Sequence, residues 1–205
     1  VAVATELRAT IERPGMVTPQ AAISAIRSAM APEDILISDV GAHKLWLGRL
    51  FPAYEPNTVI ISNGFATMGI GLPGAIAAKL ALPERRIVTV SGDGGFLMNV
   101  QEMETATRLG VPVVVVLWVD GKYGVIGWKQ ERRFGRTYAI EFGNPDFAGL
   151  AASFGWAHRE TTDGGALRDA LAGALDGEVP TLITVPIDYR QNVRLANLGE
   201  PSLGA

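Results

Sequence analysis

The sequence reads Ile87-Val88-Thr89-Val90-Ser91-Gly92-Asp93-Gly94-Gly95 near its middle, and this stretch decides the fold. The apolar, β-branched run predicts a buried strand, and the glycines after it predict a tight turn into a helix. Glycine lets the backbone approach a bulky anion closely, and the first N–H groups of a helix point at such an anion. Asp93 would repel a phosphate unless a divalent cation lay between them. The stretch therefore predicts a strand that ends in a site for phosphate and magnesium.

The same alternation of strand and helix continues on both sides of this stretch. Apolar runs predict strands at 35–37, 58–61, 87–90, 113–117 and 181–185, and helices are expected at 19–30, 42–51, 68–82, 96–109, 145–154 and 166–175. Strands without polar alternation, separated by helices, indicate a parallel sheet covered by helices on both faces. The predicted fold class is α/β, and ligands are expected outside the C-terminal ends of the strands.

A second carboxylate is expected beside Asp93. The strand at 113–117 leads into Trp118-Val119-Asp120-Gly121-Lys122-Tyr123-Gly124, and Asp120 lies 27 residues after Asp93. A helix and a strand fill this interval, so both carboxylates reach the same edge of the sheet. An isolated Gly-Asp-Gly is a plain tight turn about as often as it is part of a binding site. A second strand-end carboxylate in a Gly-rich loop favours a metal site instead.

These two segments together resemble the thiamine diphosphate motif, which begins with Gly-Asp-Gly and ends in a pair of Asn-type residues. The resemblance implies that Mg²⁺ is held by Asp93, Asp120 and the backbone carbonyl of Lys122. The pair here reads Val119-Asp120; Asp120 still supplies an oxygen, whereas Val119 cannot be a ligand. The resemblance also implies that thiamine diphosphate contacts Gly92, Asp93, Gly94, Gly95, Asp120, Lys122, Tyr123 and Gly124.

Two further segments extend the resemblance. The segment from Ser38 to Trp46 is similar to the one in acetolactate synthases whose Gly-x-His, here Gly41 and His43, approaches the diphosphate. A surface or helix-capping role is the alternative for His43. The segment from Ser62 to Gly69 resembles the one that grips the aminopyrimidine. There the carbonyl of Ala66 would accept a hydrogen bond from the 4′-amino group, and Met68 would donate its N–H and wedge the cofactor into a bent shape.

Several motifs resemble the catabolic, FAD-independent acetolactate synthases in particular. They are Arg49-Leu50-Phe51 with Tyr54-Glu55-Pro56, Trp118, and Val185-Pro186-Ile187-Asp188-Tyr189. The resemblance implies a transferase that converts two pyruvate molecules into 2-acetolactate and carbon dioxide, as in branched-chain or acetoin metabolism. The alternatives are another thiamine diphosphate-dependent 2-oxoacid decarboxylase or carboligase, and a non-catalytic module that binds a phosphorylated ligand.

The resemblance also implies an incomplete active site. The family's activating Glu, which bonds N1′ of the pyrimidine, lies in a different domain, usually on a partner subunit. No segment here resembles it, so no catalytic residue is assigned and the isolated chain is expected to be inactive. The chain opens without Met, and Pro14-Gly15 is a boundary signal. Residues 1–15 are therefore expected to end a preceding domain or linker, and residues 16–205 to form the C-terminal thiamine diphosphate-binding domain of a longer enzyme.

Composition limits the partners of the 205-residue chain. With 18 basic and 21 acidic residues its net charge is −3, so it lacks the field that holds nucleic acid. It has no membrane-length apolar stretch. The absence of cysteine fits a reducing compartment, and we expect a cytoplasmic location. Apolar faces meant for missing N-terminal and central domains should drive self-association as a homo-oligomer, and a dimer is expected.

The remaining polar and sulfur-containing side chains are interpreted as structural. His158 has no glycine or strand-end context. The basic run Lys129, Arg132, Arg133 and Arg136 is interpreted as a solvated helix face or a subunit contact, and closure over the diphosphate is the less favoured alternative. Met98, Met103 and Trp128 are expected in the core or at an interface.

Overall fold

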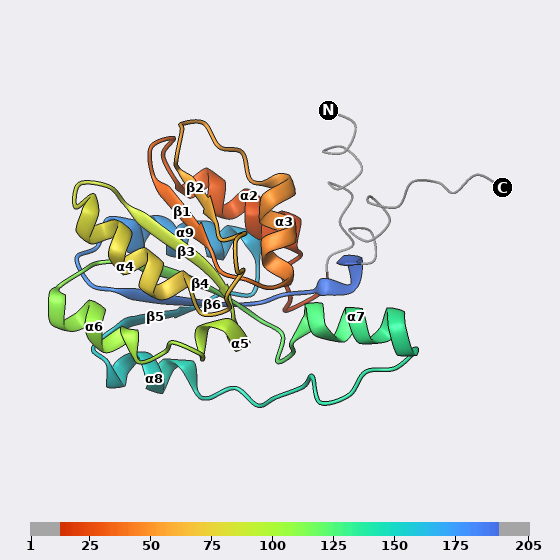
Figure 1. Ribbon diagram of the computed structural model, residues 1–205. Coiled ribbons are helices and arrows are strands. Elements are labelled where there is room, and N and C mark those ends of the chain that lie inside the picture. Colours follow the sequence, from red (N-terminus) through yellow and green to blue (C-terminus); the bar gives the residue numbers. More distant parts are fainter. Residues whose placement is uncertain (1–12, 193–205) are drawn as a thin grey trace.

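One parallel sheet organises the chain. The computed structural model describes residues 13–192, so most of the expected leading segment 1–15 lies outside the described residues. The strands are β1 (Ile35–Ser38), β2 (Val59–Ile61), β3 (Ile87–Gly92), β4 (Val114–Val119), β5 (Ala157–Glu160) and β6 (Thr181–Pro186). Their order is β2-β1-β3-β4-β6-β5, and every pairing is parallel. The predicted α/β class is confirmed (Figure 1).

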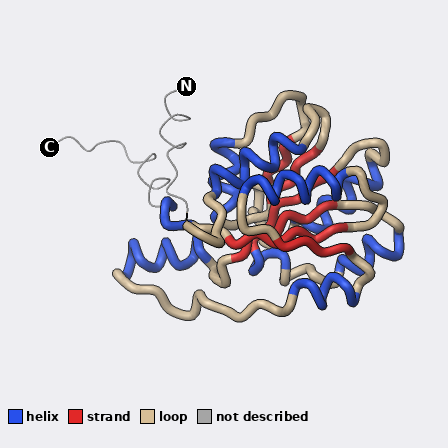
Figure 2. The backbone as a smooth tube through the Cα atoms, turned by 180° about the vertical axis from the view of Figure 1, so that it is seen from behind, coloured by secondary structure: helices blue, strands red, loops and turns tan. Residues whose placement is uncertain are grey.

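Helices cover both faces of the sheet, as Figure 2 shows from behind. One face packs against α2 (Pro19–Ala29), α3 (Ala42–Leu50) and α9 (Gly164–Leu175). The other packs against α4 (Gly71–Ala81), α5 (Asp93–Phe96), α6 (Glu102–Leu109) and α8 (Phe147–Ser153).

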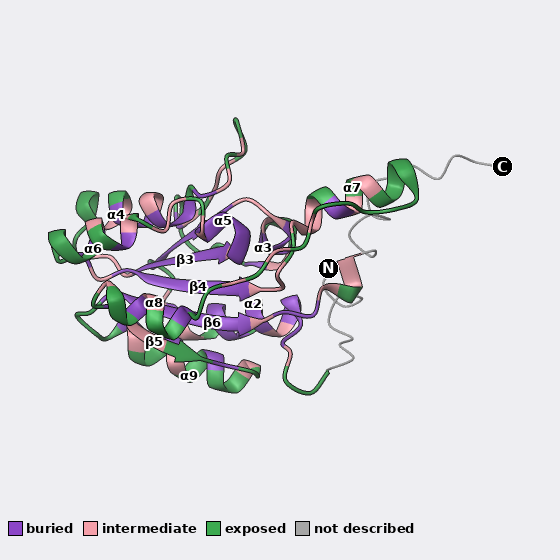
Figure 3. Ribbon diagram, turned by 90° about the horizontal axis from the view of Figure 1, so that it is seen from below, coloured by how far each residue is buried: buried purple, intermediate pink, exposed green. Residues whose placement is uncertain are grey.

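The central strands consist of continuous apolar residues because helices cover both faces of the sheet. In β4, Val114, Val116 and Trp118 face one helical layer. Val115 and Leu117 face the other layer. Successive side chains of a strand point to opposite faces, so a strand buried on both sides needs apolar residues at consecutive positions. The central strands are accordingly buried along their length (Figure 3).

Capping residues begin two of the predicted helices. Thr18 Oγ1 accepts a hydrogen bond from Ala21 N–H at 3.3 Å, and Pro19 occupies the first turn of α2. Asp163 Oδ1 accepts from Ala166 N–H at 2.8 Å at the start of α9. Helix α9 therefore begins at Gly164, two residues before the expected start.

The prediction of a single helix over 96–109 is wrong, because helix α5 ends at Phe96 and helix α6 begins only at Glu102. After α5, the chain makes successive turns up to the start of α6, including Met98 N–H to Gly95 O at 3.1 Å and Met103 N–H to Val100 O at 3.1 Å. Asn99 in these turns uses its side chain to bond the carbonyl of Gly69 at 2.9 Å. Phe96, Met103 and Ala106 are nevertheless buried, as their spacing predicts.

Three elements were not predicted, and one of them is the short 3-10 helix η1 (Tyr189–Gln191) after β6. Strand β5 is Ala-His-Arg-Glu, a polar edge strand that pairs only with β6 and so carries no apolar run. Helix α7 (Gly124–Phe134) stands to one side of the sheet and buries only Gly127 (Figures 1 and 3). It carries Lys129, Arg132 and Arg133, which are exposed, as is Arg136 after it. This arrangement agrees with a solvated helix face.

The strand order creates a crevice at the C-terminal ends of the strands. From β1 the chain moves outward to β2, returns to β3 on the other side of β1, and then proceeds to β4. Ligands of such sheets bind at the point where the strand order reverses, outside the C-terminal ends of the strands. Here that point lies between β1 and β3. Within residues 13–192, no helix has the length and apolar content needed to cross a bilayer.

The packing of α9 gives a test of the core. Leu171 on α9 is fully buried. We expect Leu171→Ala to lower the free energy of unfolding by about 2–5 kcal/mol, because it leaves a cavity beneath the helix. Leu80→Ala is the matched control, since Leu80 on α4 is 56% exposed, and its effect should stay within about 0.5 kcal/mol. Urea unfolding followed by circular dichroism measures both; equal effects would contradict this view of the core.

Candidate functional site

A cleft with about 420 Å³ of empty space opens where β1, β3 and β4 end. Of the cofactor residues predicted from sequence, all except Ala66 line it. The segments after three strands therefore meet in one place, as the parallel sheet requires. The lining consists of Val40, Gly41, Ala42, His43, Met68, Gly92, Asp93, Gly94, Gly95, Asp120, Lys122, Tyr123, Gly124, Val125, Ile126 and Tyr189.

Asp93 joins the segments at the centre of this cleft. Its carboxylate is 1% exposed. Oδ1 accepts a hydrogen bond from Gly94 N–H at 2.8 Å. Oδ2 accepts from Gly121 N–H at 2.7 Å and from Asp120 N–H at 3.1 Å. Asp93 thereby connects the end of β3 to the loop after β4, where the second predicted ligand lies.

A negative charge on Asp120 is unfavourable in this cleft. Burial, and after it the negative charge of Asp93, raise the pKa of Asp120 to about 7. The backbone N–H and the side chain of Lys122 act in the opposite direction and only partly offset this rise. Two carboxylates that repel each other in a buried cleft favour a divalent cation, which would lower that pKa again.

Lys122 turns its side chain out of the cleft. Its Nζ pairs with Glu141 Oε1 at 2.7 Å, and both side chains are largely exposed. The contribution predicted from sequence is its backbone carbonyl, and this ion pair leaves that backbone at the cleft edge. The next residue, Tyr123, is held by a hydrogen bond from its N–H to Ile140 O at 2.8 Å.

The imidazole ring of His43 packs closely against Gly41 and Gly92. It is 1% exposed, and its Nε2 is buried without a hydrogen-bond partner. A Cβ at Gly41 would lie 2.7 Å from His43 Cε1, which forces a shift, and one at Gly92 would lie 3.3 Å from His43 Nδ1, a tight contact. Burial lowers the pKa of His43 to about 4, although the carboxylate of Asp39 raises it. The ring is therefore neutral at pH 7 and has an unsatisfied nitrogen at the cleft.

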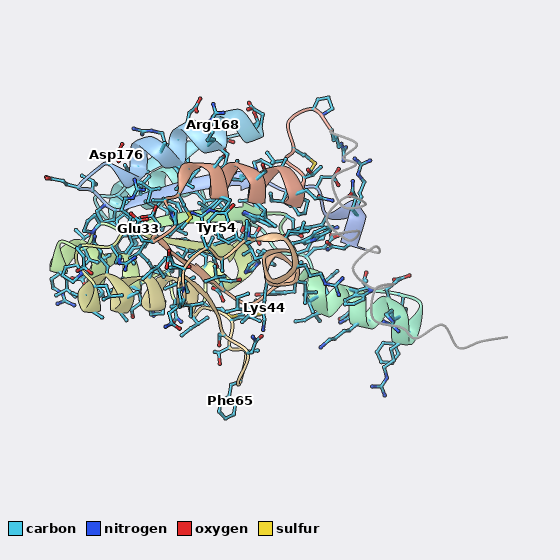
Figure 4. All side chains as sticks on the ribbon, turned by 90° about the horizontal axis from the view of Figure 1, so that it is seen from above. Glu33, Lys44, Tyr54, Phe65, Arg168 and Asp176 are labelled. Atoms are coloured by element: carbon cyan, nitrogen blue, oxygen red, sulfur yellow. The ribbon has the colours of Figure 1, made fainter. Side chains whose placement is uncertain are left out.

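The segment from Ser62 to Gly69 contributes Met68 to the cleft wall. Ala66 does not line the cleft, but it adopts φ +50°, an uncommon conformation for a residue with a Cβ. Phe65 at the loop tip is fully exposed and projects away from the body (Figure 4). Met68 brings this loop to the cleft, and Ala66 with its positive φ lies two residues before it.

Three residues of the site were not assigned a role from the sequence. Asn144 Nδ2 donates to Asp93 Oδ2 at 2.8 Å, although 51 residues separate them. Tyr189 lines the cleft after β6, where burial, followed by the charges of Asp120 and Asp93, raises its pKa well above the ordinary value. Asp39 lies buried behind the cleft. Asp39 and Tyr189 each follow a strand end and stand in motifs that resemble acetolactate synthases, whereas Asn144 has neither signal.

The donor set fits magnesium with a phosphorylated ligand better than magnesium alone. Among the described residues, no group of three His, Cys, Asp or Glu side chains could hold a metal ion. Asp93 and Asp120 offer carboxylate oxygens, and a hard cation needs about six oxygen ligands. Phosphate oxygens bound beside the Gly92–Gly95 turn could supply the rest. The orphaned His43 Nε2 is a donor or acceptor available to the same ligand.

The family model described as "Thiamine pyrophosphate enzyme, C-terminal TPP binding domain" matches residues 39–185. The chain belongs to this family. The match begins at the residue after β1, runs through most of β6 and includes every residue of the cleft lining except Tyr189. Thiamine pyrophosphate is another name for thiamine diphosphate, so the family predicted from the motif is confirmed.

Curated relatives of this TPP-binding domain include acetolactate synthases. The chain is 40% identical over 179 residues to "Acetolactate synthase" of Bacillus subtilis, covering 87% of the chain and 31% of that protein. It is 37% identical over 191 residues to "Acetolactate synthase, catabolic" of Raoultella terrigena, covering 90% and 34%. The chain thus spans about a third of the length of these relatives.

A solved structure shares the fold of the domain. The thiamine diphosphate-dependent 4-hydroxybenzoylformate decarboxylase of Rhodococcus jostii RHA1 superposes with a TM-score of 0.80 at 21% sequence identity. The superposition covers 88% of this chain and 34% of that one. At this identity the likeness establishes the fold alone.

The shifted pKa values of His43 and Asp120 act on stability in opposite directions. The pKa of His43 in the folded chain, about 4, lies below its ordinary 6.5. The stability that neutral His43 contributes is therefore fully present above pH 6.5 and is lost as the pH falls through 4. The folded pKa of Asp120, about 7, lies above its ordinary 3.8. Its contribution is present below pH 3.8 and is lost as the pH rises through 7.

We expect these two contributions largely to cancel between pH 4 and pH 6.5 in the metal-free chain. His43→Asn should make stability fall with rising pH relative to the parent, and Asp120→Asn should make it rise, each by up to about 1.4 kcal/mol per pH unit. Urea unfolding with a chelator across this range measures both slopes. Two variants that keep the parental pH dependence would show that neither pKa is shifted.

Proposed function

We propose that this chain is the diphosphate- and Mg²⁺-binding domain of an acetolactate synthase-like enzyme that converts two pyruvate molecules into 2-acetolactate and carbon dioxide. One observation carries the proposal: Asp93 and Asp120 meet at the ends of adjacent strands, with Asp93 Oδ2 bonded to the backbone of Asp120 and Gly121. The names and identities of the curated relatives support the acetolactate reaction over other reactions of the family.

In this proposal, Asp93, Asp120 and the carbonyl of Lys122 hold the Mg²⁺. The turn from Gly92 to Gly95, together with Gly41 and Gly124, leaves room for the diphosphate beside it. A side chain at Gly94 would lie 2.7 Å from the ring of Tyr123, so glycine there keeps the cleft open. His43, neutral at pH 7, would place its free Nε2 toward a phosphate oxygen.

The other end of the cleft would receive the thiamine rings. Met68 would pack against them, and its backbone N–H and the carbonyl of Ala66 would bond the aminopyrimidine. When bound, thiamine diphosphate supplies the carbon nucleophile and the electron sink for decarboxylating a 2-oxoacid. The residues of this chain bind and orient it. Pyruvate would be the substrate, and the rest of the enzyme, including further domains and a second copy in a homo-oligomer, would complete the site.

The metal assignment predicts graded effects in the complete enzyme that we propose. Asp93→Ala should abolish Mg²⁺-dependent binding of thiamine diphosphate, because it removes both a ligand and the link between two loops. Asp120→Ala should weaken binding, whereas Asp120→Asn should be tolerated because an amide oxygen remains a ligand for a hard cation. Asp169→Ala, at an exposed position on α9, is the control. Titration calorimetry measures all four, and unchanged binding in Asp93→Ala would overturn the assignment.

The 205-residue chain alone should not turn over pyruvate. Among the described residues no glutamate lines the cleft, and Glu102 and Glu104 lie in the first turn of α6. General acid–base assistance of the kind the missing Glu would provide is worth about 10²–10⁴-fold. The purified chain, incubated with pyruvate, Mg²⁺ and thiamine diphosphate, is assayed for acetolactate and carbon dioxide. Turnover near that of a complete acetolactate synthase would mean that the chain contains its own activating acid.

The same assay on the complete enzyme separates the alternatives. Acetolactate as the product supports the proposal, and an aldehyde would identify a simple 2-oxoacid decarboxylase. Cofactor binding without turnover would identify a binding module.

A further inference from the structure

Asp39, at the end of β1, is a fully buried carboxylate outside the predicted ligand set. Three neutral groups donate hydrogen bonds to it. Val40 N–H donates to Oδ1 at 2.6 Å, and Ser91 Oγ donates to Oδ2 at 2.8 Å. Gly69 N–H donates to both oxygens, at 2.9 and 3.2 Å. A buried charge is costly unless its hydrogen bonds are made, so this carboxylate holds its three partners firmly.

These partners belong to three separate segments. Val40 continues β1, and Ser91 is the residue before the Gly92–Gly95 turn on β3. Gly69 ends the loop that carries Ala66 and Met68. Asp39 therefore joins the Met68 loop to the two strand ends that form the other side of the cleft.

Gly69 is held from two sides. Its N–H bonds Asp39, and its carbonyl accepts from Asn99 Nδ2 at 2.9 Å. It adopts φ +89°, which a side chain would strain, and a Cβ there would lie 2.8 Å from Asn99 Nδ2. This residue is thus a fixed end of the loop.

The rest of the loop has little packing of its own. Phe65 at its tip is fully exposed, as Figure 4 shows. At its start, Lys44 Nζ donates to Ser62 O at 2.7 Å. The Asp39 and Asn99 bonds hold Gly69, the residue next to Met68, and helix α4 begins two residues further on at Gly71.

We propose that Asp39 is a positioning residue that holds the Met68 loop against the cleft, so that its loss weakens binding of the thiamine rings more than binding of the diphosphate. The inference rests on the proposed function, because it assigns the rings to the Met68 side and the diphosphate to the Asp93 side. Asp39 itself does not line the cleft.

Two ligands distinguish this role from a general structural one. Thiamine diphosphate carries the rings, and inorganic pyrophosphate carries only the diphosphate. Calorimetry at fixed Mg²⁺ on the complete enzyme gives both affinities. Asp39→Ala should lower the affinity for thiamine diphosphate about tenfold or more, because a loop that loses a bond worth about 1–3 kcal/mol spends less time in the binding position. Its affinity for pyrophosphate should fall clearly less, because Asp93 keeps its bonds to the Gly94 and Gly121 N–H groups.

Two further variants keep the test decisive if Asp39→Ala folds poorly. Asp39→Asn keeps an oxygen for Gly69 N–H and can donate to Ser91 Oγ, so it should restore affinity for thiamine diphosphate. Asn99→Ala, at a half-buried position, removes the other bond to Gly69 and should reproduce the selective loss. Asp93→Ala is the reference in which both affinities fall together.

The outcomes are separable. Equal loss of both ligands in Asp39→Ala and Asn99→Ala, or no loss of either, would overturn the positioning role. A parent enzyme that binds neither ligand in the presence of Mg²⁺ would overturn the proposed function itself.

Discussion

The carboxylate of Asp93 is the interaction on which the site depends. It is buried at the end of β3 and accepts hydrogen bonds from its own turn, from the loop after β4 and from Asn144. All of these donors are neutral, so the bonds order three loops without cancelling the charge. The charge therefore remains available to a cation, and the loops are already arranged when it arrives. Such preorganisation places ligand groups without further conformational cost.

Steric constraints act together with this charge. The ring of His43 lies close to Gly41 and Gly92, and the ring of Tyr123 lies close to Gly94. These contacts hold aromatic rings at the cleft wall while the backbone stays accessible to a ligand. The cleft thus combines a negative centre, a neutral imidazole and open backbone. Lys122, the one basic residue among its described lining residues, turns its ammonium toward Glu141. A diphosphate accompanied by Mg²⁺ suits that combination better than a free anion.

Two buried carboxylates accept hydrogen bonds from different segments around the cleft. Asp93 ties β3 to the loop after β4, and Asp39 ties β1 and β3 to the Met68 loop. The two ends of the cleft are therefore fixed by different residues, although β3 contributes to both. If thiamine diphosphate binds as proposed, its two chemically distinct ends would be held mainly by different residues.

The sequence alone predicted the α/β class, the family and most of the cleft lining, but not Val40, Ala42, Val125, Ile126 and Tyr189. Continuous apolar strands demand burial on both faces, and parallel strands bring Gly41, Asp93 and Asp120 to one edge. It missed β5, whose four polar residues at an edge need no apolar run, and it joined α5 and α6 because periodicity cannot reveal the turns between them. Only the tertiary structure decided the partners of the buried carboxylates. Asn144 reaches Asp93 across 51 residues, and Gly69 reaches Asp39 across 30. Hydrogen bonds between loops leave no periodic pattern in a sequence, because they depend on where the packed sheet places each loop.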